Sequence, residues 1–316
     1  VEGQISAGAI IAASVLLSRA VQPIELIVGA WSGIVQGRAS WNNLIDLFAA
    51  TADQDQARTL LPKPVGLLTL DGVGVRSPAG DTPLLRHVSL SLQPGESLGV
   101  VGPSGAGKTT LARLIAGATE PDVGTVRLDK ADYATWDPER LARHIGYLPQ
   151  DSVLFAGTVK ENISRFDGSL EQPREDVDER AIKAARLAGC HDMILKLPHG
   201  YDTPLGAQGR GLSAGQAQRI ALARALYGDP CLVVLDEPNS HLDGEGEAAL
   251  AKALAGLRTR GATVIIVAHR SGVLQNVDKL LVLRDGAVEG LGPRNEIAAR
   301  LQAGRQPAPR VVSSVN

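Results

Sequence analysis

From residue 67 onward, short apolar runs alternate with segments whose apolar residues recur at helical spacing. Continuous apolar runs predict buried strands, and a period near 3.6 predicts helices that bury one face. Strands are expected at 67–75, 88–92, 97–101, 125–128, 145–148, 232–235, 263–268 and 279–283. Helices are expected at 111–115, across 159–197 with an interruption by an acidic, polar surface stretch at 167–180, at 217–227 and at 245–257. This alternation predicts an α/β fold with a mostly parallel sheet covered by helices.

The N-terminal part of the chain has a different pattern, because residues 4–37 are mostly apolar. Only Arg19, Pro23 and Glu25 interrupt this stretch, and a helical stripe continues to Phe48. One interpretation is a helix buried against the protein or a partner. The other is the end of a last membrane helix that continues into the cytoplasm, with the charges at or beyond the interface. The prolines within 56–66 predict a linker after this helix.

Composition narrows the class of protein. The formal net charge of −2 lacks the basic excess of a nucleic-acid binder, so no nucleic-acid partner is expected. Two distant cysteines indicate neither a disulfide framework nor a zinc site, and favour a reducing compartment. The chain begins at Val1 and its only methionine is Met193, so we expect it to be a piece of a longer protein.

The most specific motif is GPSGAGKTT at 102–110, between an apolar run and a helical segment. The pattern G-x-x-x-x-G-K-[ST] forms a turn whose N–H groups, together with the following helix N-terminus, bind phosphate. Lys108 is expected to reach the β- and γ-phosphates, and the Thr109 hydroxyl to ligate Mg²⁺. The motif therefore predicts a nucleoside triphosphate site formed by Gly102, Pro103, Ser104, Gly105, Ala106, Gly107, Lys108, Thr109 and Thr110.

Two carboxylates follow the apolar run at 232–235. Asp236, at the strand tip, is placed to hold the Mg²⁺ shell as the second acidic site of phosphate-loop enzymes does. Glu237 is placed to polarise an attacking water as general base. A pair of acidic residues on a surface turn is common, but the buried aliphatics before this pair favour the catalytic interpretation.

The segment LSAGQ at 212–216 precedes a helix rich in alanine and leucine. Ser213 is a good N-cap, and Gly215 permits the close approach of a phosphate. Five motifs follow one another along the chain: the phosphate loop, the sequence LPQ at 148–150, this segment, the carboxylate pair and the sequence AHR at 268–270. In that order they resemble the motifs of ATP-binding cassette (ABC) ATPases.

The resemblance implies an ABC-type P-loop ATPase with a mixed-sheet core at 67–302 and a helical subdomain at about 151–227. A terminal transmembrane and cytoplasmic helix at 1–50 and a linker at 51–66 would precede this domain, and a disordered tail would occupy 303–316. The expected ligands are ATP and Mg²⁺, and ATP would be held between two copies in a homodimer.

The resemblance also assigns roles to single residues. Gln150 matches the lid glutamine that senses Mg²⁺ and the attacking water, so the implied metal set is Thr109, Gln150 and Asp236. The implied catalytic set is Glu237, His269 and Gln150, with His269 touching the γ-phosphate. The signature residues that would contact the γ-phosphate held by the other subunit are Ser213, Gly215 and Gln216.

Two positions depart from the family pattern. The stretch 73–78 contains no aromatic residue where most members stack adenine. Val75 or Pro78 would have to supply an apolar contact, or nucleotide affinity and base selectivity would be weaker, so we expect modest affinity. His241 stands where the family usually has alanine, and we interpret it as a tolerated surface residue.

Residues 18–25 and 237–243 resemble type I secretion ABC transporters, which export proteases, lipases or S-layer proteins from Gram-negative bacteria. This resemblance implies an ATPase domain on the cytoplasmic side of the bacterial inner membrane. The implied partners are its own transmembrane domain, a periplasmic membrane fusion protein, an outer-membrane channel protein and a secreted protein substrate. A lipid, drug or peptide exporter remains an alternative. A soluble ABC ATPase acting on nucleic acid is a weaker one, because it would need a basic surface and either coiled coils or tandem cassettes.

Overall fold

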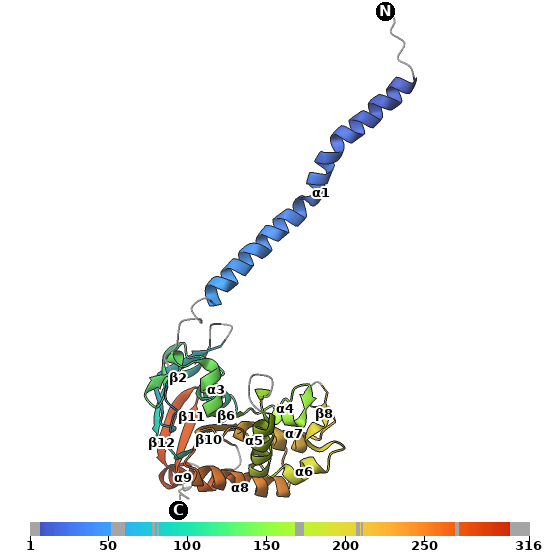
Figure 1. Ribbon diagram of the computed structural model, residues 1–316. Coiled ribbons are helices and arrows are strands. Elements are labelled where there is room, and N and C mark those ends of the chain that lie inside the picture. The colour runs from blue at the N-terminus through green and yellow to red at the C-terminus, as the bar shows by residue number, and fades with distance from the viewer. Residues whose placement is uncertain are drawn as a thin grey trace, which may run out of the picture. The chain divides into compact units, whose positions relative to one another are not determined.

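The computed structural model describes residues 7–51, 61–77, 80, 82–167, 174–206, 209, 211–268 and 272–303. The chain divides into two compact units, Val1–Arg58 and Thr59–Asn316 (Figure 1). The expected division at residues 50 and 66 remains a prediction. The expected contact of His269 and the tail beyond residue 303 lie outside the described residues.

The first unit contains one long helix, α1 (Ala7–Thr51), which runs through Pro23 without a break. Proline removes one backbone donor from a helix interior, yet flanking apolar turns keep this helix continuous. Residues Ala7–Phe48 are long and apolar enough to cross a membrane, and none of this span is buried within the chain. Isoleucine, valine and tryptophan side chains along it are exposed to more than half their full extent, for example Ile11, Val28 and Trp31.

The centre of the second unit is a six-stranded sheet with the order β12-β11-β3-β10-β9-β6. Only the β11–β12 pair is antiparallel within this sheet, so the sheet is mixed, as expected. Its central strands are buried along their whole length, which explains their continuous apolar runs. The strands are β3 (Ser97–Val101), β6 (Ile145–Leu148), β9 (Leu232–Asp236), β10 (Thr263–Val267), β11 (Lys279–Arg284) and β12 (Ala287–Pro293).

A four-stranded antiparallel sheet lies over one side of helix α2 (Lys108–Ile115). Its order is β2-β1-β4-β5, and one hydrophobic cluster joins it to α2 and to the six-stranded sheet. The strands are β1 (Leu68–Arg76), β2 (Pro83–Leu92), β4 (Val123–Leu128) and β5 (Ala131–Asp132). Strand β2 begins five residues before the expected position 88, because its first half contains the exposed Arg86 and His87 and forms no apolar run.

A second hydrophobic cluster holds the helical part of this unit to the other face of the six-stranded sheet. The segment expected to be helical across 159–197 consists of separate helices, and Gly189 ends α5 with a φ of +66°. This part contains α4 (Val159–Ile163), α5 (Arg174–Leu187), α6 (His191–Leu195), α7 (Ala214–Leu226), β7 (Gly157–Thr158) and β8 (Pro204–Leu205), which Figure 1 shows to one side of the strands. The remaining helices are α3 (Pro138–His144), α8 (Gly244–Thr259), α9 (Arg294–Ala303) and the short 3₁₀ helices η2 (Tyr133–Thr135), η4 (Gly200–Asp202) and η6 (Val273–Asn276).

Candidate functional site

The parallel register of the six-stranded sheet brings the sequence motifs to one edge. Val100 of β3 pairs with Val267 of β10, and Val267 pairs with Asp236 of β9. Leu148 of β6 pairs with Leu235 in the same sheet. The phosphate loop, the carboxylate pair and Gln150 therefore follow the carboxyl ends of β3, β9 and β6 in one sheet, with β10 between β3 and β9, and open α/β sheets bind ligands at this edge.

The phosphate loop is packed too closely for side chains at two of its glycines. A Cβ atom on Gly102 would lie 2.2 Å from the backbone oxygen of Leu283, and one on Gly107 would lie 2.6 Å from that of Leu84. Gly107 also has a φ of +93°. Since the neighbouring atoms are backbone, the loop admits only glycine there and remains close to β2 and β11.

Lys108 begins α2 and turns back onto the loop that precedes it. Its Nζ donates hydrogen bonds to the carbonyl oxygens of Gly102 at 3.0 Å and Pro103 at 2.8 Å. Burial lowers the pKa of Lys108, and the neighbouring carboxylates of Glu237 and Asp236 oppose that shift. The ammonium thus lies inside the curl of the loop, where a bound phosphate would meet it.

Asp236 is the last residue of β9 and is fully buried. Neither of its carboxylate oxygens accepts a hydrogen bond. Desolvation raises the pKa of Asp236, the charge of Glu237 adds to the shift, and the nearby Thr109 hydroxyl, Lys108 and Arg113 oppose it. Thr109 is thus close enough to affect the carboxyl group without forming a hydrogen bond of ordinary geometry. A buried carboxylate without a partner is a costly arrangement that a bound cation would relieve.

The donor set at this edge fits Mg²⁺. Carboxylate, hydroxyl and amide oxygens are available from Asp236, Thr109 and Gln150, and Mg²⁺ prefers oxygen ligands completed by water and substrate phosphates. Among the residues that the structure describes, no group of three or more His, Cys, Asp or Glu side chains is arranged to hold a metal alone.

Glu237 adopts an uncommon backbone conformation. Its φ is +52°, in the left-handed region, and its N–H donates to the carbonyl oxygen of Val267 at 2.9 Å. Such a conformation costs a non-glycine residue roughly 1–3 kcal/mol and is concentrated at functional sites. The turn places a half-buried carboxylate directly after the buried Asp236, whereas Gln150 on the neighbouring strand end is exposed.

The signature segment forms the N-terminus of α7, as expected. The Ser213 Oγ accepts a hydrogen bond from the Gln216 N–H at 3.3 Å, and the Gln216 Oε1 accepts one from the Ser213 N–H at 2.9 Å. This capping box fixes the helix start while Ser213 and Ala214 remain exposed. A Cβ atom on Gly215 would lie only 3.0 Å from the backbone oxygen of His241. The helix N-terminus is therefore rigid and open to an anion from outside.

Within one chain, the signature segment and the phosphate loop are not joined. No hydrogen bond or ion pair connects 213–216 with 102–110 among the described residues. The structure thus groups the phosphate loop, the carboxylates and Gln150 at one edge, and leaves the signature segment to contact something else.

One candidate for the missing adenine contact is excluded. Val75 is buried in the core between the sheets, so its side chain is not available to a base, and Pro78 lies outside the described residues.

Gln218 is a residue that the motifs did not single out, although its side chain is buried beside Glu237. A polar position inside an amphipathic helix carries no signal of such burial.

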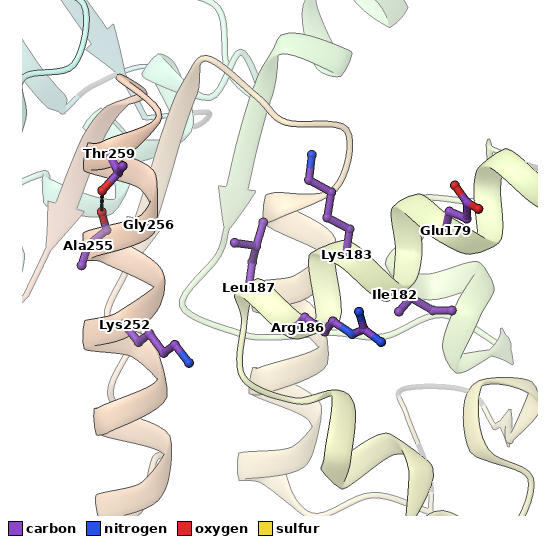
Figure 2. A pocket seen from close by; sticks show the side chains of 9 residues that line it. All are labelled: Glu179, Ile182, Lys183, Arg186, Leu187, Lys252, Ala255, Gly256 and Thr259. Atoms are coloured by element: carbon purple, nitrogen blue, oxygen red, sulfur yellow. Dashed lines mark hydrogen bonds between the residues drawn. The ribbon is translucent and has the colours of Figure 1, made fainter.

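A cavity of about 790 Å³ lies elsewhere, between α5 and α8 (Figure 2). None of the expected site residues lines it. Figure 2 shows that the side chains around it come from these two helices, and they are Glu179, Ile182, Lys183, Arg186, Leu187, Lys252, Ala255, Gly256 and Thr259. This cavity belongs to the contact between the helical part and α8, and not to the edge that carries the phosphate loop.

Comparison with known proteins gives consistent matches. The family model described as ABC transporter matches residues 85–240. The type I secretion system ATP-binding protein PrsD of Rhizobium meliloti (strain 1021) is 45% identical over 99% of this chain and 53% of its own length. The leukotoxin translocation ATP-binding protein LktB of Mannheimia haemolytica is 35% identical over 94% of this chain and 41% of its own length.

A solved structure of a bacterial Atm1-family ABC exporter with ATP bound also matches, with a TM-score of 0.74 and 29% identity. The alignment covers 95% of this chain and 52% of that exporter. The chain thus spans about half the length of the relatives it matches.

Proposed function

This chain carries an ABC transporter domain and belongs to the ABC transporter family, and on this premise we propose that it powers type I secretion of a protein across a Gram-negative envelope. The observation that carries the proposal is the single sheet edge that combines the phosphate loop with a strained glutamate and a buried, unpaired aspartate. The 45% identity to a type I secretion protein supports the choice of cargo class.

ATP binding follows from the ABC domain, and the phosphate loop provides the binding groups. Lys108 would exchange its bonds to the loop carbonyls for bonds to the β- and γ-phosphates, while the loop N–H groups and the start of α2 bind the same anion. Asp236, Thr109 and Gln150 would hold the Mg²⁺ that accompanies ATP, an ion that neutralises charge on the phosphate oxygens.

Hydrolysis requires a water aligned with the γ-phosphate. Glu237 would accept a hydrogen bond from that water and draw its proton away as the oxygen attacks phosphorus. Gln150, on the adjacent strand end, would orient the water, and His269 would contact the γ-phosphate. The left-handed turn at Glu237 supports this role, because it fixes the carboxylate immediately beyond the metal position.

The second half of the site would come from another copy of the chain. The exposed, capped start of α7 is suited to the γ-phosphate, and it is not joined to the phosphate loop of its own chain among the described residues. Two copies packed head to tail would place Ser213, Gly215 and Gln216 of each copy against the ATP of the other, closing two equivalent sites. ATP would then favour the closed dimer, and hydrolysis would release it.

The proposal extends to the membrane and to further proteins. The length and exposed apolar surface of α1 support a transmembrane and cytoplasmic helix at 1–50, a linker at 51–66 and an ATPase domain at 67–302. We place the ATPase domain on the cytoplasmic side of the inner membrane. The further partners are the chain's own transmembrane domain, a periplasmic membrane fusion protein, an outer-membrane channel protein and a secreted protein substrate.

The catalytic part of the proposal is tested with Glu237→Gln in the full chain, kept in detergent. This variant should bind ATP and form dimers, yet lose turnover by about 10²-fold or more, because the general base is missing. Glu120→Gln is the matched control, since Glu120 is exposed and remote from the motifs. Ordinary turnover by Glu237→Gln would remove Glu237 from the role of base.

The cargo class is tested separately. Purification from a Gram-negative host should recover the protein with a periplasmic membrane fusion protein, and addition of the secreted substrate should alter its ATPase rate. Stimulation by lipid or drug alone, with no such adaptor, would instead support export of small molecules.

A further inference from the structure

The Gln218 side chain is the most heavily bonded amide near the carboxylates. It lies on α7 and is only 2% exposed. Its Nε2 donates to the carbonyl oxygen of Pro238 at 2.8 Å. The same nitrogen donates to the carbonyl oxygen of Glu237 and to the hydroxyl of Ser240, each at 3.3 Å. Its Oε1 accepts a hydrogen bond from the His241 N–H at 3.1 Å. Both ends of the amide are therefore bonded to the segment that follows β9.

Neighbouring residues of α7 reinforce this attachment. Gly215 is packed closely against the backbone of His241, so that even one added carbon would lie 3.0 Å from its oxygen. Arg219 donates from Nη2 to Asp243 Oδ1 at 2.9 Å. The first two turns of α7 and residues 237–243 thus form one connected body, in which Gln218 is the buried central link.

The two ends of this body serve different ATP molecules if the head-to-tail dimer of the proposed function is correct. Ser213 at the start of α7 faces the γ-phosphate bound by the other copy, and Glu237 acts on the ATP of its own phosphate loop. We propose that Gln218 is a positioning residue that couples the two ATP sites of the dimer. When γ-phosphate fixes α7, Gln218 transmits that position to the backbone carbonyl of Glu237.

The strained turn makes this transmission effective. Glu237 adopts a φ of +52°, so its carboxylate position depends on the bonds that hold the turn from both sides. Val267 holds its N–H from within the sheet, and Gln218 holds its carbonyl oxygen from α7. Loss of the Gln218 bond would remove this attachment of the turn to α7 and leave the Glu237 carbonyl oxygen bonded within its own segment, where the Ser240 N–H donates to it at 3.2 Å, so turnover should be affected more than ATP binding.

A matched pair of variants tests the proposal in the full chain. Gln218→Glu keeps the shape and the acceptor for His241 but removes the donor to the Glu237 and Pro238 carbonyls. Asn162→Asp is the control, because Asn162 is a fully buried amide that donates in the same way to the carbonyls of Phe155 and Thr158. Gln218→Met provides a second, uncharged variant if Gln218→Glu does not fold.

Both exchanges should lower the thermal midpoint, since each removes buried hydrogen bonds. Only the Gln218 variants should lower kcat, by about tenfold or more, while KM for ATP stays within about threefold, which is the pattern of a lost transition-state contribution. Their Hill coefficient for ATP should fall towards 1, because the coupling between sites is removed.

Each of the following results would overturn the coupling. Wild-type kcat and Hill coefficient in both Gln218 variants would contradict it, as would an equal loss of both in Asn162→Asp. A wild-type Hill coefficient near 1, together with a monomeric Glu237→Gln protein, would contradict the dimer itself and the coupling with it. A cooperative wild type with cooperative Gln218 variants would leave the proposed function standing and reject only the coupling.

Discussion

Asp236→Asn is expected to stabilise the protein without nucleotide and to abolish its turnover. The carboxylate of Asp236 is fully buried and accepts no hydrogen bond, so the nucleotide-free protein carries a desolvation cost that Thr109, Lys108 and Arg113 offset only in part. An unsatisfied buried polar group costs about 1–3 kcal/mol, and a charged one more. Asparagine keeps the shape and removes the charge, so a gain of about 1–3 kcal/mol is expected, or roughly 2–12 °C in Tm for a domain of this size.

The gain should depend on pH in a defined direction. Because burial raises the pKa of Asp236 in the folded protein, the wild type loses stability as the pH rises through that raised pKa. The neutral amide does not titrate. The difference in Tm between variant and wild type should therefore grow as the pH rises above the ordinary pKa of an aspartate.

Differential scanning calorimetry of the full chain in detergent and EDTA measures this difference. The exposed Asp71 provides the control, and Asp71→Asn should leave Tm within about 2 °C, as surface substitutions do. With Mg²⁺ and ATP, the wild type should gain stability by linkage and Asp236→Asn should gain less. A variant less stable than the wild type at pH 8 in EDTA would refute the reasoning, because it would mean that the carboxylate has a compensating partner.

Further predictions concern the signature helix, the phosphate loop and the base. Ser213→Ala should cost about 1 kcal/mol through the lost cap and should lower the Hill coefficient of ATP turnover, whereas unchanged cooperativity would separate α7 from the nucleotide. Gly107→Ala should lower Tm and abolish nucleotide binding, because its Cβ would lie 2.6 Å from the Leu84 oxygen; calorimetry and an ATP titration check both effects. GTP should bind within roughly tenfold of ATP, because aromatic stacking worth about 1–3 kcal/mol is missing from the sequence. Strict selectivity for adenine in parallel titrations would contradict this last expectation.

The phosphate loop and the buried strands could be predicted from the sequence for a physical reason. A parallel strand covered on both faces must be apolar at every position, so 232–235 and 263–268 stand out as continuous runs. Motifs at the ends of such runs must meet at one edge. The resemblance to ABC ATPases implied the ABC domain and the mixed sheet, and the apolar stretch at 4–37 predicted a long N-terminal helix; all three are confirmed.

Other features leave no local signal. Strand β12 has no buried position, so its residues form no apolar run, and it was not predicted. Within the helical region expected across 159–197, the break between α5 and α6 was not predicted, because it depends on Gly189 taking a left-handed conformation against Ala249, a long-range contact. The burial of Gln218 and the turn at Glu237 likewise depend on the packing of α7 against the segment after β9. The roles of the single site residues remain predictions.

The central claim, that ATP is held between two copies, is tested most directly by a cross-link. Cysteines are introduced as Ser104→Cys in the phosphate loop and Ala214→Cys beside the signature serine, both exposed positions, with Cys190 and Cys231 replaced by alanine and Glu237→Gln retaining ATP. A disulfide should form between two chains and double the apparent mass only when Mg²⁺ and ATP are present. A disulfide within one chain, or one between chains that forms equally without ATP, would contradict the account.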